Sequence, residues 1–115
     1  MAIIKNQVGG HVATLDTSNA TYTTANLASP NTSIETVTAM AVGKILWTGD
    51  WVIKQGSTVL FQSPANTAGF WDLTAQGMIF QGSNTSANIT ANTTGSASTL
   101  SMVFTKYAYN IQGID

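Results

Sequence analysis

The side chains that could carry acid–base or nucleophilic chemistry are few in this chain, and they form no catalytic motif. Histidine is the side-chain type that changes charge near neutral pH, and His11 is the only one in the sequence. A catalytic histidine needs a nucleophile and an orienting acid within hydrogen-bonding reach. None of the five acidic residues stands in a recognisable pattern with His11. We therefore predict that His11 is a structural or solvated residue.

Asp50 and Asp72 are the acids that could act as the paired carboxylates of a glycosidase. Asp50 follows Gly49 in a dipeptide typical of turns, and Asp72 alternates with Trp71 and Leu73 in an expected strand. A turn residue and a solvent-facing residue are the simpler interpretation. The sequence also shows no glycine-rich phosphate loop, nucleophile elbow or metal-ligand spacing. It predicts a protein that is not an enzyme and that needs neither cofactor nor metal.

Aromatic side chains offer a different chemistry, because exposed rings can stack on sugars. The candidate platform consists of Trp47, Trp51, Phe70 and Trp71, with Gln62 or Asn66 as hydrogen-bonding partners. Strand alternation instead places most of these rings in a core, and we expect the tryptophan side chains to be core residues. Phe70 and Trp71 are adjacent and point to opposite faces, so one of them is expected at the surface, where it would mark an interface.

The composition points to binding or assembly. Only nine residues carry a formal charge, there is no Arg and no Cys, and the chain holds 18 Thr, 10 Ser, 9 Asn and 6 Gln. A net charge of −1 gives no long-range attraction to nucleic acid or to an anionic membrane. No apolar run approaches the roughly 20 residues that span a bilayer, and the opening residues do not resemble a secretory signal. We expect folding in a reducing cytosol and a near-neutral surface that favours association.

The elements that must position these groups are short strands in one domain, residues 1–115. Strand-forming runs between turn residues predict strands at 3–8, 11–15, 35–42, 45–48, 51–54, 58–62, 70–73, 78–81 and 100–109, and possible strands at 21–24 and 87–91. Residues 70–73 are expected to pair with 78–81 across a turn at 74–77. Polar loops are expected near 16–33 and 82–99, with a tail at 110–115. About eight to ten short strands predict an all-β fold, an antiparallel β-sandwich or a jelly-roll-like barrel.

Alternation within these strands predicts the core. The side chains expected to meet in one sandwich interior are Ile45, Trp47, Trp51, Ile53, Val59, Phe61, Trp71, Leu73, Met78, Phe80, Leu100, Met102 and Phe104.

Apolar residues at both ends of the chain suggest contacts there. Either the terminal strands pair with each other, which we expect for the strands proper, or the ends dock on a neighbour. For the tail at 111–115 both alternatives stay open. The predicted partner-binding residues are Ile3, Ile4, Phe70, Tyr107, Tyr109, Ile111 and Ile114.

Three stretches of the chain resemble small structural proteins of tailed marine phages, notably cyanophages: residues 1–11 (MAIIKNQVGGH), 47–56 (WTGDWVIKQG) and 71–78 (WDLTAQGM). The resemblance implies a β-rich virion protein, above all a capsid decoration protein that sits where capsid subunits meet and holds the shell. It implies no catalytic residues.

Three functional hypotheses follow from the residues and the resemblance. The first is a capsid decoration or cement protein whose partners are the major capsid protein or other virion subunits. This protein would be an oligomer or bound to the lattice, and located in the virion after assembly in the host cytoplasm. The second is a neck, tail or baseplate subunit. The third is a carbohydrate-binding module that recognises host glycans. All three expect no direct contact with nucleic acid and none with a membrane.

Overall fold

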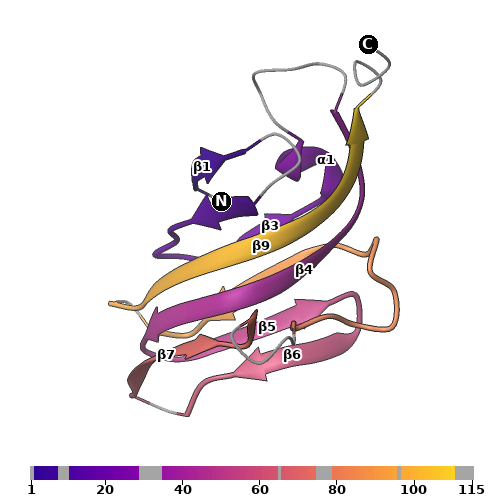
Figure 1. The fold of residues 1–115 in the computed structure, drawn as a ribbon. Coiled ribbons are helices and arrows are strands. Elements are labelled where there is room, and N and C mark those ends of the chain that lie inside the picture. The colour runs from indigo at the N-terminus through magenta and orange to yellow at the C-terminus, as the bar shows by residue number, and fades with distance from the viewer. Residues whose placement is uncertain are drawn as a thin grey trace.

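The computed structural model of the chain describes residues 2–7, 11–28, 35–64, 66–74, 79–95 and 97–110. Two antiparallel sheets face each other, one with strand order β1-β2-β9-β4-β7 and one with order β3-β8-β5-β6 (Figure 1). The elements are β1 (Ile3–Asn6), β2 (His11–Thr14), β3 (Ala20–Tyr22), α1 (Thr24–Leu27), β4 (Glu35–Thr48), β5 (Trp51–Gln55), β6 (Thr58–Gln62), β7 (Ala68–Asp72), β8 (Ile89–Thr93) and β9 (Thr99–Asn110). The predicted all-β sandwich is confirmed. In the part of the chain that the structure describes, the sheets do not close into a barrel.

The core lies between the two sheets and follows strand alternation. In β9, Leu100, Met102 and Phe104 are fully buried, while the residues between them face outward and are partly exposed. Trp51 and Ile53 of β5 and Ile45 of β4 are buried against them. Burying such apolar side chains is the main stabilising contribution to a domain of this size.

Two residues expected in this core are instead exposed. Val59 is 51% exposed because the register of β6 against β5 shifts between Ile53 and Lys54. The extra residue breaks the alternation, so Phe61 opposes Ile53 on the inner face and Val59 opposes Lys54 on the outer face. Trp71 lies on the inner side of an edge strand and is 47% exposed. The expected core residue Met78 lies outside the described residues.

β4 is one strand of 14 residues, although two strands at 35–42 and 45–48 were predicted. Gly43, which falls between those two predicted strands, lies where the register against β9 shifts between Val42 and Lys44. A β-bulge bends a strand without ending it. A Cβ at position 43 would lie 2.7 Å from Cγ2 of Thr74, so any other residue here would force the Thr74 side chain to move.

The segments predicted to pair with each other both pair with β4 instead. β7 pairs with Lys44–Thr48, and Phe80 forms an isolated bridge with Val42 through two backbone hydrogen bonds of 2.7 and 2.9 Å. The local hairpin was therefore wrong. The longer β4 offers one edge with room for both segments.

The two expected polar loops contain secondary structure. Within 16–33, Asp16 bridges to Leu100 and β3 precedes α1, whose N-cap Thr23 accepts a hydrogen bond from the backbone of Asn26. The possible strand at 21–24 is therefore β3 followed by this cap. Within 82–99, β8 lies at the centre of the four-stranded sheet, two residues later than the possible strand at 87–91.

The molecule is elongated, with extents of 50 × 25 × 25 Å. β4 and β9 form a long curved ribbon that continues upward past α1 in Figure 1. The two terminal strands share a sheet, but β2 lies between them and pairs with both. The expected direct pairing of the terminal strands was therefore wrong.

Candidate functional site

The residues considered and rejected as catalytic candidates come from separate elements: His11 from β2, Asp50 from the turn between β4 and β5, and Asp72 from β7. His11 is exposed at the start of β2, in a shallow depression whose lining includes Lys44 and Thr74 and no acid. Asp50 accepts a hydrogen bond of 2.8 Å from the backbone N–H of Asn66. This hydrogen bond holds the loop at Asn66 against the turn at Asp50, and none of the described residues that line the depression at His11 is an acid.

Asp72 likewise has a local role. Its Oδ1 accepts a hydrogen bond of 3.0 Å from the backbone N–H of Thr74, and its Oδ2 lies 3.8 Å from Nζ of Lys44. Among the residues that the structure describes, no group of three or more His, Cys, Asp or Glu side chains could hold a metal ion.

The four rings considered as an alternative aromatic platform do not share one face. Trp51 is buried in the core and donates its indole N–H to the carbonyl of Thr48. Trp47 is half-buried and packs against Phe61 with ring centroids 4.7 Å apart. Trp71 contacts the same core edge-on, whereas Phe70 points to the opposite side of the sheet. A flat sugar ring would therefore find no single face that presents these rings together.

The outward face of the five-stranded sheet carries an apolar row. Leu46 of β4 is 52% exposed, and its register partners are Phe70 of β7, 60% exposed, and Ser101 of β9. The β2–β9 register, continued past Ala13, places Leu15 opposite Ser101. Leu15 is 46% exposed. We call these four residues the outer row: Leu15, Ser101, Leu46 and Phe70.

The outer row is bordered by little net charge. The next pair along the same strands is Lys44 and Asp72, which form an ion pair and cancel each other. Exposed apolar side chains that are contiguous, as Leu46 and Phe70 are, mark interaction surfaces more often than scattered ones do.

The predicted partner-binding residues lie in different environments. Phe70 belongs to the outer row, Ile4 is 63% exposed where β1 shifts register, and Tyr107 is 43% exposed on β9. Ile3 packs against the core instead. The backbone of Tyr109 pairs with Thr36. The remaining two, Ile111 and Ile114, lie outside the described residues.

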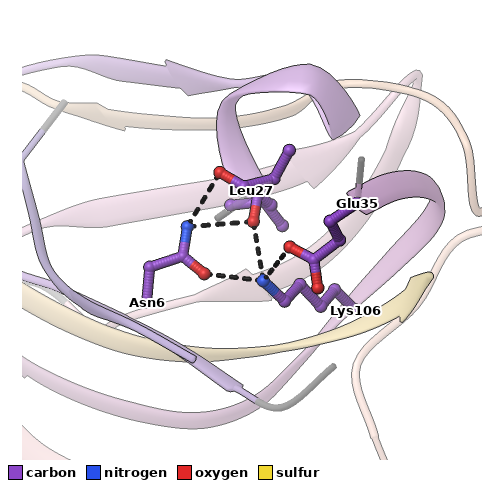
Figure 2. Close-up of polar contacts among 5 residues, drawn as sticks. Asn6, Leu27, Glu35 and Lys106 are labelled. Atoms are coloured by element: carbon purple, nitrogen blue, oxygen red, sulfur yellow. Dashed lines mark hydrogen bonds and ion pairs between the residues drawn. The ribbon is translucent and has the colours of Figure 1, made fainter. Parts of the chain in front are cut away.

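A buried polar cluster was missed by the sequence analysis. Nζ of Lys106 lies 2.7 Å from Oε1 of Glu35, and both side chains are fully inaccessible (Figure 2). Nζ also donates to Oδ1 of Asn6 at 2.6 Å and to the carbonyl of Leu27 at 3.0 Å. A signal was present, since Lys106 continues the inward series of Leu100, Met102 and Phe104 on β9.

Two further polar side chains, those of Tyr22 and Gln55, are buried and hydrogen-bonded in the interior. The hydroxyl of Tyr22 donates a hydrogen bond to Oδ2 of Asp16. Burial, together with this carboxylate, raises the pKa of Tyr22 above its usual range. Gln55 of β5 donates to the carbonyls of Met40 and Thr85 and accepts from the N–H of Gly82. The amide of Gln55 thereby connects the two sheets.

We compared the chain with protein-family models, with curated proteins and with solved structures, and it matches none of them. The described part of the chain contains no helix with the length and apolar character to span a bilayer.

Proposed function

We propose that this protein is a non-enzymatic structural subunit of a phage virion, in the first place a capsid decoration protein. The observation that carries the proposal is the outer row, three exposed apolar side chains and a serine on a sheet face that the rest of the described chain leaves uncovered. The resemblance of residues 1–11, 47–56 and 71–78 to phage structural proteins supplies the class of partner.

The physical basis of such a role is binding to the assembled state. A subunit that binds across neighbouring capsid proteins stabilises the shell over its free subunits by mass action. An apolar strip with little net charge around it suits permanent contact, because burying apolar area contributes free energy without desolvating unpaired charge. The low charge of the chain as a whole agrees with a subunit that ends up in an assembly.

The test is co-sedimentation with phage heads assembled without this protein, using the wild type, a Leu46→Ser/Phe70→Ser variant and a Val59→Ser control. Val59 is similarly exposed, but it lies on the other sheet. We expect the wild type and the control to bind at a copy number that matches the capsid lattice. Loss of two central apolar contacts should weaken binding roughly 10- to 100-fold.

Other outcomes would decide against the proposal. Equal binding by the outer-row variant would show that another surface makes the contact. A wild type that ignores heads but binds isolated necks, tails or baseplates would move the protein to that part of the virion. Binding to a glycan array, lost in a Phe70 or Trp71 variant, would support a carbohydrate-binding module instead.

A further inference from the structure

Three reactive side chains from three strands meet in the interior near α1. Asn6 comes from β1, Glu35 from the start of β4, and Lys106 from β9 (Figure 2). The amine nitrogen of Lys106 lies 2.6 Å from the amide oxygen of Asn6 and 2.7 Å from a carboxylate oxygen of Glu35. Lys106 is the one lysine of the four that is buried; Lys5 is exposed, and Lys44 and Lys54 are partly exposed.

The amide of Asn6 is held in one orientation. Its Nδ2 donates to the carbonyls of Leu27 at 3.0 Å and Ala28 at 3.1 Å, so its Oδ1 is the atom turned toward Lys106. The carbonyl carbon of Asn6 is one bond beyond that oxygen. A nucleophile fixed this near an electrophile gains the large rate advantage of an intramolecular reaction.

We propose that Lys106 and Asn6 form an intramolecular isopeptide bond, with Glu35 as the proton relay. This inference does not depend on the proposed virion role. Lysine amines are competent nucleophiles when they are neutral. In a buried pair, transfer of one proton from Nζ to the carboxylate yields two neutral groups and avoids the cost of two charges in a medium of low dielectric.

The reaction balances without any external reactant. Glu35 takes one proton from the Lys106 ammonium, and the neutral amine attacks Cγ of Asn6 to give a tetrahedral adduct. Glu35 returns a proton to Nδ2, the Cγ–Nδ2 bond breaks, and ammonia leaves. The Nζ–Cγ bond is then an amide, and Glu35 accepts the last proton of the former ammonium and ends as a neutral acid or releases it. No group is oxidised or reduced.

The link would tie together strands that do not pair. β2 lies between β1 and β9, so the bond crosses one strand and joins residues 100 positions apart. It would close most of the chain into a covalent ring.

The test is mass spectrometry of the folded wild type after prolonged incubation. The intact mass should fall about 17 Da below the sequence mass, the mass of the ammonia that leaves. Trypsin cleaves after lysine, and the chain has lysines only at 5, 44, 54 and 106 and no Arg. We expect residues 6–44 joined to residues 55–115 in one branched peptide, because modified Lys106 resists cleavage.

Three variants define the chemistry. Asn6→Ala, which keeps the Lys106–Glu35 pair, and Glu35→Gln should retain their full sequence masses. Lys44→Ala, which removes a lysine that lies beside the acid Asp72 at the surface, should lose ammonia as the wild type does. Circular dichroism would show that each variant is folded.

The wild type alone can overturn the proposal, whatever the variants do. An unshifted mass with a released peptide 107–115 would exclude the bond. A mass loss without the branched peptide would point to succinimide formation at some asparagine and would also exclude it. Full linkage in folded Glu35→Gln would overturn the relay role assigned to Glu35.

Discussion

At the scale of single residues, the chain buries a large share of its few charged groups. Asp16, Glu35 and Lys106 are each at most 6% exposed. A buried charge is tolerable only when it is paired and hydrogen-bonded. Lys106 uses three donors on three acceptors, and Asp16 accepts from Tyr22. The contacts of Lys106 fix where β1, α1 and the start of β4 meet β9.

The raised pKa of Tyr22 predicts a loss of stability at alkaline pH. The folded state holds the phenol proton more tightly than the unfolded state, whose tyrosine pKa is near 10. This contribution is complete below pH 10 and declines as the pH rises above it, because only the unfolded state then releases the proton. Urea unfolding between pH 8 and pH 11 should show that decline.

The matched variants separate Tyr22 from other alkaline effects. Tyr22→Phe should be less stable at pH 8 by about 1 kcal/mol, since a buried hydrogen bond to a carboxylate is lost. Its stability should fall less steeply above pH 10. Tyr107→Phe, at a partly exposed position, should keep the wild-type slope. An equally steep decline in both variants would assign the alkaline effect to other groups.

At the scale of elements, the packing of β7 on β4 depends on the glycine at position 69. A Cβ at Gly69 would lie 2.7 Å from two ring atoms of Trp47, its register partner on β4. The Trp47 ring therefore crosses over Gly69 to pack on Phe61, and its indole N–H donates to Oγ1 of Thr67 at 3.2 Å. β7 in turn carries Phe70 of the outer row, so this packing also positions the proposed contact surface.

Replacing Gly69 by alanine should destabilise the protein by roughly 1–3 kcal/mol, because the Trp47 ring must leave its position over the strand. Denaturant unfolding of Gly69→Ala, Trp47→Leu and the double variant measures the coupling. The double variant should be more stable than the sum of the two single losses predicts, since leucine does not reach the added methyl. Strict additivity would mean that the added methyl does not act through Trp47.

At the scale of the whole molecule, the sequence predicts the layers better than their connections. The alternation of Leu100, Met102 and Phe104 is local, so it identifies the inward face of β9 from the residues alone. Whether Gly43 ends a strand or forms a bulge depends on β9 and Thr74, which are distant in sequence. The pairing of β7 with β4 rather than with its neighbour is likewise decided by long-range packing.

The candidate sites were likewise predictable only where local geometry decides the position of a side chain, and not where long-range packing does. Phe70 was expected to mark an interface because its neighbour Trp71 takes the other face, a consequence of local geometry. Its place in a row with Leu46 and Leu15 depends on three strand registers that the sequence does not specify. The meeting of Asn6, Glu35 and Lys106 depends on residues up to 100 positions apart, so only the inward position of Lys106 could be foreseen.

The proposed bond between Asn6 and Lys106 leads to a prediction about the stability of the whole chain. If the isopeptide bond closes a loop of 100 positions, it limits the unfolded ensemble as a disulfide would. The chain-entropy model then gives the linked wild type an advantage of about 4–5 kcal/mol over Asn6→Ala, beyond the lost hydrogen bonds of Asn6. Urea unfolding of both proteins measures the difference.

The denaturant dependence distinguishes closure of the chain from loss of local contacts. An unlinked chain exposes more surface when it unfolds, so Asn6→Ala should show a larger m value than the linked wild type. Glu35→Gln, which keeps Asn6 but should not form the bond, should share that larger m value. A lower midpoint with an unchanged m value in both variants would mean that the cluster stabilises the fold through hydrogen bonds alone. The size of the surface exposed on unfolding thus reports, independently of mass, whether β1 and β9 are covalently joined.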